Sequence, residues 1–371
     1  MKKKYIVTPW EVSGEVDYDK LIKEFGIKRI SESLLERIKR HTKELHPFLR
    51  RRIFFAHRDL DWILDEYEKG NKFYLYTGRG PSGDMHLGHL IPMIFTQWLQ
   101  EKFDTEVWFQ MTDDEKFYFK EDLTIEETNR IAYENALDVI ALGFKEGKTY
   151  IFSDFDYAKT LYKHAALVAK ELNFSTVKAV FGLNESSNVG KIFFTSMQSV
   201  PAFLPSIKAG KNIPCLIPHA VDQDPHFRIS RDILPKLGFY KPASIQSIFL
   251  PGLAAGKMSS SVRESAIFIT DSERDIERKV ANAFTGGRAT LKEQREKGGN
   301  PDICSVYTYF YLLFMPDDKE IENLREKCKS GEIICGECKK MLAERIKKFI
   351  AEHKKKREEA KKKLDKFIIK D

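Results

Sequence analysis

The sequence contains no long run of apolar residues. Its longest uncharged segment, residues 192–207, is interrupted by Pro201 and Pro205 and contains several hydroxyl and amide side chains. A membrane-spanning helix needs about 20 apolar residues, so we expect no transmembrane segment and no membrane partner. The first ten residues, MKKKYIVTPW, have a basic start with no apolar stretch after it, unlike a secretory signal. We therefore expect a cytoplasmic protein.

The sequence also contains few cysteines and has a small net charge. Five cysteines in 371 residues argue against a disulfide framework in a cytosolic chain. The formal net charge is only +7, from 62 Lys and Arg against 55 Asp and Glu. Residues 339–371 carry fourteen Lys and Arg against six Asp and Glu, so this tail accounts for +8 and the preceding 338 residues for −1. The charge therefore points to an anionic partner only at the C-terminal tail.

The order of predicted elements indicates an α/β domain in the middle of the chain. Residues 73–77 (FYLYT) are typical of a buried strand and lead through a glycine-rich turn into an apolar helix from His89 to about Phe103. A second strand follows at 106–111, which completes a βαβ unit and starts a parallel sheet. Further strands are predicted at 149–152, 214–217 and 245–250.

The glycine-rich turn, GRGPSG at 78–83, fits the pattern G-x-G-x-x-G between a strand and a helix. This is the context of a dinucleotide-binding turn, but the pattern alone is weak because glycines here often serve only the backbone. Pro81 removes one N–H group that would bind phosphate. A nicotinamide-binding turn is followed about 20 positions later by an acidic residue that bonds to the ribose of the cofactor. In this sequence the second predicted strand begins too late to place an acidic residue there. Both observations count against a nicotinamide cofactor.

Two histidines follow this turn at the start of the predicted helix. His86 and His89 flank Gly88, where the helix end supplies unsatisfied N–H groups and partial positive charge. A single histidine is more often structural, but two around a glycine here favour an anion site. About 170 residues later, Lys257-Met-Ser-Ser-Ser261 combines a lysine with hydroxyl groups, which suits a polyphosphate whose charge grows in the transition state.

Taken together, these motifs resemble class I aminoacyl-tRNA synthetases, and more narrowly tryptophanyl-tRNA synthetases of the archaeal and eukaryotic type. The resemblance covers nearly the whole chain. The early TPWEV and RRRIFFAHRD stretches resemble the N-terminal extension of that branch. The matching segments, in the family's order, are YTGRGPSGDMHLGHL, FQMTDDEKF, IFSDFDY, KIFFTSMQSVPAF, CLIPHAVDQDPHFRISRD and KMSSS.

The resemblance implies three parts. Residues 1–70 would form an N-terminal extension, which we expect to be mainly helical, and residues 71–265 a Rossmann-type catalytic domain with a parallel sheet. An insertion within the catalytic domain, at about 150–205, would supply the contacts between the two chains of a homodimer. Residues 266–371 would form an all-helical domain that binds the anticodon of tRNA(Trp).

The resemblance also implies a reaction: activation of L-tryptophan by ATP and Mg²⁺, then transfer to the 3′ end of tRNA(Trp), with release of AMP and pyrophosphate. His86 and His89 would hold the ATP phosphates, while Lys257 and Ser259 would stabilise the triphosphate. These three, Lys257, His86 and His89, are the catalytic candidates. The expected ATP-binding set is Gly78, Gly80, Pro81, Ser82, His86, Gly88, His89, Lys116, Asp222, Lys257, Met258, Ser259, Ser260 and Ser261.

For tryptophan, the matching positions are Tyr76, Gln110, Glu115 and Gln223. The indole N–H only donates, so it needs a buried acceptor, which Tyr76 and Gln110 could provide together. The α-ammonium group needs Glu115 or the amide oxygen of Gln223. Without the motif match, a strand tyrosine such as Tyr76 would more simply be a core residue.

Two departures from the family pattern bear on the site. Much of the class has a second lysine where this loop has Ser260, so the positive charge must come from Lys257, with Lys116 as a possible supplement. Ala254 stands where the eukaryotic branch often has glutamine, which puts an amino-acid contact from that position in doubt.

Four of the five cysteines are close in sequence: Cys304, Cys328, Cys335 and Cys338. Their C-x2-C end is common in zinc and iron–sulfur sites, although helical cysteines also serve as small apolar residues. The spacing resembles that of a few tryptophanyl enzymes that carry an iron–sulfur cluster. We expect either a cluster or a zinc ion here, against the alternative of plain core residues.

Three other functions compete with the leading prediction. A tyrosyl-tRNA synthetase shares the fold and much of the motif order, but the residues GRGPSG in the glycine-rich turn disfavour it. A non-catalytic synthetase-like RNA-binding protein would not need His86, His89 and Lys257. A nicotinamide oxidoreductase leaves KMSSS without a role.

The basic tail has two compatible interpretations. Apolar residues repeat at helical spacing at Leu342, Ile346 and Ile350, whereas HKKKREE, residues 353–359, shows no apolar face. The tail is therefore expected to be a helix docked on its own domain, with lysines that face solvent or contact tRNA phosphates.

Overall fold

The computed structural model describes residues 6–7, 12–13, 17–254 and 263–371. Within these ranges, nine strands lie in two sheets. Their bounds are β1 Ile6–Val7, β2 Val12–Ser13, β3 Lys28–Arg29, β4 Phe54–Arg58, β5 Tyr74–Arg79, β6 Val107–Met111, β7 Thr149–Ser153, β8 Cys215–Ala220 and β9 Ala243–Ser247. The first two pair only with each other, and the other seven form one sheet in the order β3-β4-β9-β8-β5-β6-β7.

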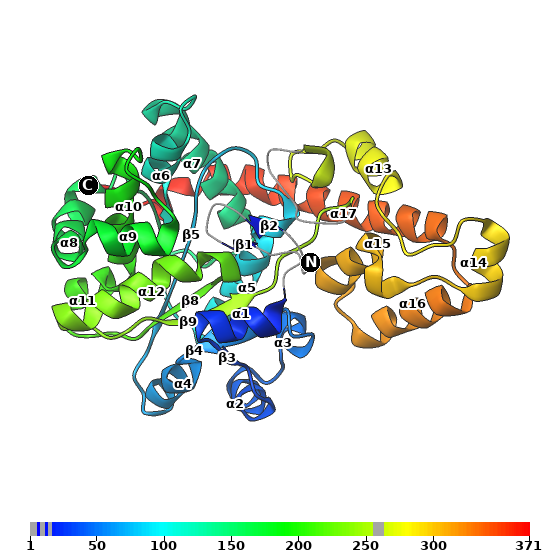
Figure 1. Ribbon diagram of the computed structural model, residues 1–371, viewed down its shortest axis with the longest axis horizontal. Helices are drawn as coiled ribbons and strands as arrows, with labels where there is room; N and C mark the ends of the chain where they lie inside the picture. The colour runs from blue at the N-terminus through cyan, green and yellow to red at the C-terminus, as the bar shows by residue number, and fades with distance from the viewer. Residues whose placement is uncertain (1–5, 8–11, 14–16, 255–262) are drawn as a thin grey trace.

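Helices surround this sheet and continue beyond it (Figure 1). Their bounds are α1 Tyr18–Phe25, α2 Glu32–Thr42, α3 Pro47–Arg50, α4 Leu60–Glu68, α5 Leu87–Phe103, α6 Asp113–Phe119, α7 Ile125–Ala141, α8 Ala158–Glu171, α9 Phe174–Phe181, α10 Val189–Ser199, α11 Leu204–Ala209, α12 Asp224–Ile233, α13 Glu273–Ala281, α14 Leu291–Lys297, α15 Ser305–Tyr309, α16 Asp318–Ser330 and α17 Cys335–Lys361.

Strands β5 to β9 are parallel to one another and confirm the α/β prediction. Starting from β5, the chain adds β6 and β7 on one side and then β8 and β9 on the other. The direction of strand addition therefore reverses between β5 and β8. In such doubly wound sheets, ligands bind at this point, outside the carboxyl ends of the strands. All the predicted tryptophan-binding residues lie on or just after β5, β6 and β8.

The strand bounds differ from prediction by a few residues. The third and fourth predicted strands match β7 and β8, although β8 continues to Ala220. The last predicted strand, 245–250, is instead β9, Ala243–Ser247. The chain leaves the sheet after Ser247, and Ile248 then donates its N–H to the carbonyl of Ile53.

The sequence suggested a mainly helical N-terminal extension, but this part of the chain also contains two strands of the main sheet. Strands β3 and β4 join the main sheet, and β4 pairs antiparallel with β9, placing Ala56 opposite Gln246. No clear strand pattern marks this part of the sequence, because the stretch RRRIFFAHR is charged on both sides of a short apolar core. The side chains of β4 are buried up to His57, so this strand covers the β9 edge of the parallel sheet.

The helical end of the chain returns to the sheet through its last helix. In Figure 1, α17 (red) runs from the group formed by α13–α16 to the opposite side, where the C-terminus lies near α8. The helix packs on both α13 and α7. After it ends, Ile369 donates to the carbonyl of Ile151 in β7, and the Asp371 carboxylate accepts from the N–H of Thr160 at 2.9 Å. The tail thus pairs with the exposed edge of β7.

The stretch HKKKREE also differs from expectation, because it does have a buried side. His353 and Ala360 are buried on α17, in line with Leu342, Ile346 and Ile350. The His353 ring lies 3.1 Å from Asp138 of α7, and the Arg357 guanidinium donates to the same carboxylate at 2.9 Å. A polar contact continues the docked face where apolar residues stop, which apolar periodicity could not reveal.

Candidate active site

The glycine-rich turn lies at the carboxyl end of β5, directly beside residues from the end of β6. Gly78 stands opposite Gln110 in the parallel pairing. A Cβ atom on Gly78 would lie 2.7 Å from the Gln110 carbonyl oxygen, so only glycine fits there. A Cβ on Gly80 would overlap the side chain of Lys116 and come within 2.8 Å of a Glu115 carboxylate oxygen. The two glycines therefore let the turn approach the residues that follow β6.

His86 and His89 stand together at the N-terminus of α5, as predicted. Their rings are stacked, with centroids 3.5 Å apart and planes 19° apart. The His86 backbone N–H donates to Nδ1 of His89 at 3.1 Å, which fixes the second ring at the helix start. His86 is also the N-cap residue of α5. The pair thus lies at the positive end of a 17-residue helix, the place that favours an anion.

Lys257, Met258, Ser259, Ser260 and Ser261 lie outside the described residues, but the segments on either side of them do not. After the gap, Leu87 donates to the carbonyl of Ile267, and Ile269 donates to that of Met85. Arg263 lies 3.4 Å from the carboxylate of Asp84. The chain that follows the serine loop is therefore fixed against the turn that carries His86 and His89.

Tyr76 and Gln110 form a buried polar pair within an aromatic core. Both side chains are fully buried, and the Tyr76 hydroxyl donates to Oε1 of Gln110 at 2.5 Å. The amide of Gln198, on α10, donates to the Tyr76 hydroxyl at 2.8 Å. Tyr76 is therefore not a simple core tyrosine, since its polar end lies in a hydrogen-bond network.

The same network continues to two buried carboxyl groups. Nε2 of Gln110 lies 2.8 and 2.9 Å from the two carboxyl oxygens of Asp154, which follows β7. Asp154 shares a hydrogen bond with Asp114. Burial is the main cause that raises the pKa of Asp114 to about 7 and the pKa of Asp154 well above its ordinary value. One proton is therefore shared between the two groups at neutral pH.

Glu115 and Lys116 form an ion pair at the same end of the sheet. Nζ of Lys116 donates to Glu115 at 2.8 Å, and the Thr112 hydroxyl donates to the other carboxylate oxygen at 2.8 Å. Burial acts to raise the pKa of Glu115, but the charge of Lys116 and these hydrogen bonds outweigh it and hold the pKa below its ordinary value. Glu115 is thus a buried anion, as the binding of an ammonium group requires.

Asp222 and Gln223 lie directly after β8, in a short 3-10 helix, Val221–Gln223, at the carboxyl end of that strand. The next residue, Asp224, is fully buried and accepts from Arg58 of β4 at 2.8 and 3.0 Å. This ion pair fixes the start of α12 to the N-terminal part of the chain. The N-terminal part of the chain thereby supports the short 3-10 helix that carries Asp222 and Gln223.

Sequence reasoning missed three residues at this site: Gln198, Asp154 and Arg79. Gln198 and Asp154 lie within matching segments, but no isolated spacing signal marks them. In Arg79, Nε and Nη2 are buried and have no hydrogen-bond partner within the described residues. Burial lowers the pKa of Arg79 to about 10, although Glu115 acts in the opposite direction. A guanidinium inside the glycine-rich turn is a positive charge available to an anion.

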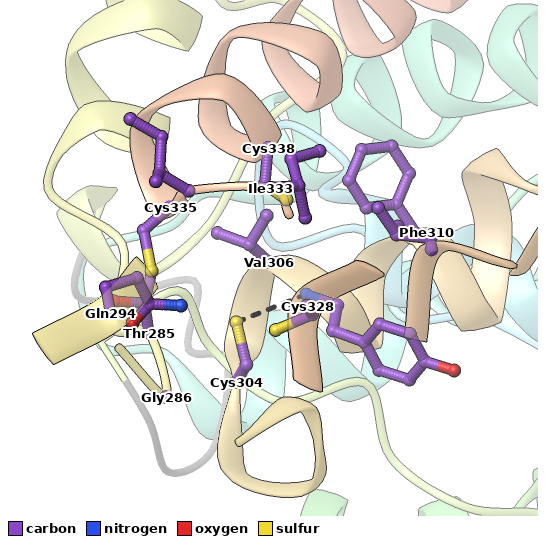
Figure 2. A pocket seen from close by; sticks show the side chains of 13 residues that line it. Thr285, Gly286, Gln294, Cys304, Val306, Phe310, Cys328, Ile333, Cys335 and Cys338 are labelled. Carbon is purple, nitrogen blue, oxygen red and sulfur yellow. Dashed lines mark hydrogen bonds between the residues drawn. The ribbon is translucent and has the colours of Figure 1, made fainter. Parts of the chain in front are cut away.

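The four clustered cysteines line one pocket in the helical part of the chain (Figure 2). Cys304 caps α15, Cys328 lies on α16, and Cys335 and Cys338 lie in the first turn of α17. Two glycines make room for the sulfur atoms, because a Cβ on Gly287 would lie 2.7 Å from Sγ of Cys335, and one on Gly299 would lie 3.0 Å from Sγ of Cys328. The helices thus bring together cysteines that are up to 34 positions apart.

Their arrangement does not match a site for a single ion. Within the described ranges, no three His, Cys, Asp or Glu side chains come together as the ligands of one metal ion. The pocket wall also contains Gln294, whose Nε2 is buried and has no hydrogen-bond partner. The five cysteines, all within the described ranges, are free thiols. No helix in the described part combines the length and apolar character needed to span a bilayer.

Comparison with known proteins agrees with this geometry. Residues 68–351 match the family described as tRNA synthetases class I (W and Y). A tryptophan–tRNA ligase of Pyrobaculum calidifontis is 50% identical over 370 residues, covering 100% of this chain and 99% of that protein. One from Thermococcus kodakarensis is 51% identical over 365 residues, covering 97% of this chain and 93% of that protein.

Solved structures agree as well. The tryptophanyl-tRNA synthetase of Plasmodium falciparum has a TM-score of 0.87 at 42% identity, covering 92% of this chain and 94% of that chain. That of Encephalitozoon cuniculi, solved with bound tryptophan, has a TM-score of 0.88 at 36% identity, covering 96% of this chain and 98% of that chain. The chain belongs to the class I tRNA synthetases of the tryptophan and tyrosine group.

Proposed function

We propose that the protein is a tryptophan–tRNA ligase. It activates L-tryptophan with ATP to form tryptophanyl-adenylate and pyrophosphate, and it then transfers the amino acid to the 3′ end of tRNA(Trp), releasing AMP. The observation that carries the proposal is the pair of buried acceptor oxygens on Tyr76 and Gln110, at the carboxyl end of the parallel sheet. The relatives named above as tryptophan–tRNA ligases support the same substrate.

The amino acid is recognised by groups that match its two polar ends. Tyr76 and Gln110 each keep an acceptor for the indole N–H, while Glu115 binds the α-ammonium group and Gln223 supplies an amide oxygen beside it. The carboxylate of tryptophan then attacks the α-phosphorus of ATP, and pyrophosphate leaves. No covalent enzyme intermediate is needed, because positioning of the two substrates and stabilisation of charge account for the rate.

ATP is held by the glycine-rich turn and the start of α5. His86, His89 and the helix N-terminus bind the phosphates, with Gly78, Gly80 and Gly88 allowing close approach. Asp222 contacts the ribose. Enzymes of this class use ATP with Mg²⁺, which would neutralise part of the triphosphate charge. Lys257 and Ser259 stabilise the departing pyrophosphate, so Lys257→Ala should sharply reduce turnover with a smaller effect on tryptophan binding.

Arg79 and Lys116 supply the positive charge that a second lysine in the serine loop would otherwise give. Lys116 already pairs with Glu115 at 2.8 Å, so its charge is partly used. Arg79 has no such partner for Nε and Nη2 within the described residues. We therefore assign the larger share of this role to Arg79, although the sequence pointed to Lys116.

The four cysteines suit an iron–sulfur cluster better than a zinc ion, the other group that their spacing indicated, because no three of the described side chains converge on one ion. Four thiols line one pocket, and Gln294 directs a buried donor with no partner toward it. A cluster is larger than an ion and suits ligands that do not converge on one point. Metal and sulfide analysis of protein purified without oxygen tests this proposal. Colourless protein that contains neither iron nor zinc would contradict it.

Two assembly partners complete the proposal. Large apolar side chains are exposed on α8, α9 and the start of α10, namely Tyr162, Leu167, Phe174 and Val189. We propose that this face forms a homodimer. The helical domain and the exposed lysines of α17 bind tRNA(Trp). A protein that charges tRNA for translation acts in the cytoplasm.

Exchange of pyrophosphate into ATP, measured with each of the twenty amino acids, tests the function. We expect exchange that depends on tryptophan. A response to tyrosine alone would establish the second candidate, a tyrosyl enzyme, which the shared family allows. No response to any amino acid would favour the non-catalytic alternative.

A further inference from the structure

We infer that Asp154 is a positioning residue that sets the preference for tryptophan by fixing which end of the Gln110 amide faces the amino acid. The inference rests on the proposed function, in which Tyr76 and Gln110 receive the indole N–H. Asp154 itself does not touch the substrate in this account. It acts through the hydrogen bonds that it accepts from Gln110.

The contacts of Gln110 distinguish its two ends. Nε2 lies 2.8 and 2.9 Å from the two carboxyl oxygens of Asp154, and Oε1 lies 2.5 Å from the hydroxyl of Tyr76. All three side chains are buried, with exposures of 1% or less. The two ends of an amide have the same shape, so the chemistry of the neighbours decides the orientation. A group that offers only acceptors to Gln110 requires the NH₂ end to face it.

The lone pairs that remain explain why this orientation matters. The Tyr76 hydroxyl accepts from the side-chain amide of Gln198 at 2.8 Å and shares its one proton between Oε1 of Gln110 at 2.5 Å and the Gln198 carbonyl at 2.9 Å, which leaves one lone pair on the hydroxyl oxygen. Oε1 of Gln110 likewise keeps one of its two lone pairs. Both open positions are acceptors, and the indole N–H is a donor. The site therefore matches indole only while Oε1 points toward Tyr76.

Reversal of the amide would remove that match. The NH₂ end would then face Tyr76 and the indole N–H, which places donors against a donor, and Oε1 would face the oxygens of Asp154. Each buried group left without its partner carries a penalty, so the reversed state is strongly disfavoured while Asp154 presents acceptors. Without Asp154, this difference between the two orientations disappears.

Asp114 ensures that Asp154 offers acceptors to Gln110. A protonated carboxyl could donate to Gln110 and favour the wrong orientation. Asp154 and Asp114 share a hydrogen bond, and a proton held between them leaves both Asp154 oxygens, at 2.8 and 2.9 Å from Nε2, able to accept from Gln110. Asp113 takes no part in this contact, because it accepts from the Ser153 hydroxyl at 2.5 Å and from the N–H of Asp154 at 2.8 Å.

The test compares tryptophan with L-β-(benzothiophen-3-yl)alanine, in which sulfur replaces the indole N–H. The measured quantity is the ratio of kcat/KM for the two amino acids in pyrophosphate exchange. We expect the unaltered enzyme to prefer tryptophan on the order of 100-fold, because the analogue leaves buried acceptors unpaired. A general loss of stability lowers both values and leaves their ratio unchanged.

Asp154→Leu keeps the volume but removes the acceptors, and we expect the preference to fall by roughly tenfold or more. Asp154→Asn can present its oxygen to Gln110 and its NH₂ to Asp114, so it should retain the preference to within about threefold. Asp138→Leu makes the same change at another buried aspartate, on α7, which bonds to His353 and Arg357 and not to Gln110, and it should also retain the preference. If Asp154→Leu does not fold, Asp154→Ala removes the same acceptors without added bulk.

The outcomes separate this inference from the proposed function. A preference that persists in Asp154→Leu or Asp154→Ala overturns the role of Asp154 while leaving Tyr76 and Gln110 in place. A preference lost equally in Asp154→Asn also overturns it, because the acceptor is still present. An unaltered enzyme that activates both amino acids equally would overturn the assignment of Tyr76 and Gln110 itself, and with it the inference.

Discussion

The shared proton between Asp114 and Asp154 makes the stability of the protein depend on pH in a specific way. Asp114 is 3% exposed, and burial is the main cause that raises its pKa from 3.8 to about 7. The protonated carboxyl group fits this buried site, whereas its ionised form costs folding free energy. The group therefore contributes to stability only while it stays protonated. The contribution is fully present below pH 3.8 and is lost as the pH rises through about 7.

Asp114→Asn removes this dependence, because an amide is neutral at every pH. Moving one pKa from 3.8 to about 7 corresponds to at most about 4 kcal/mol of folding free energy, and the value belongs to the pair because Asp154 titrates with it. We therefore expect the free energy of unfolding of Asp114→Asn, relative to the unaltered protein, to improve by up to about 4 kcal/mol between pH 4 and pH 8.

The assay is urea denaturation followed by circular dichroism at several pH values across this range. Burial also lowers the pKa values of His46, His219 and His226 to about 4, which gives a change of opposite sign. Those groups are present in both proteins, so their effect cancels in the difference. A difference in stability that stays constant from pH 4 to pH 8 would refute the shared proton and the burial argument behind it.

Three further predictions follow from the site and from α17. Tyr76→Phe removes one acceptor for the indole N–H and leaves the Gln198 amide without its partner at 2.8 Å. The value of kcat/KM for tryptophan in pyrophosphate exchange should therefore fall by about 10–100-fold, and an unchanged value would show that Tyr76 does not bind the indole. Cys328→Ala should abolish bound iron or zinc, measured by elemental analysis, and full retention of metal would exclude that thiol as a ligand. Replacing the exposed Lys355 and Lys356 by alanine should weaken tRNA binding and reduce its salt dependence, with adenylate formation unchanged. Lys354 is left intact because it donates to the Asp271 carbonyl at 2.9 Å. Unaltered tRNA binding would show that the two lysines do not contact tRNA.

The sequence predicted the parallel sheet and much of the site because local signals marked them. The strand before GRGPSG and the histidines after it lie within one short stretch, and their chemistry follows from their position at a helix start. Tyr76 and Gln110 came from the family resemblance, and the structure places them in hydrogen-bond contact. Glu115 lies near them, buried and paired with Lys116.

The remaining features depend on contacts between distant parts of the chain. Asp154 reaches Gln110 across 44 positions, and Gln198 reaches Tyr76 across 122. No periodicity or spacing within either segment indicates such a contact. The same holds for β4, whose pairing with β9 decides that a charged stretch becomes a strand, and for His353, whose burial depends on Asp138.

Competitive charging of tRNA(Trp) measures directly whether the enzyme selects tryptophan over tyrosine. The enzyme is given ATP, the tRNA transcript, and labelled tryptophan and tyrosine at equal concentrations, and the two aminoacyl-tRNA products are quantified. We predict tryptophanyl-tRNA in excess by a factor on the order of 1,000 or more, because the buried acceptors are placed for an indole N–H and not for the hydroxyl group at the end of a phenol ring. Tyrosyl-tRNA in comparable or greater amount would contradict the assignment of Tyr76 and Gln110 as the groups that select tryptophan.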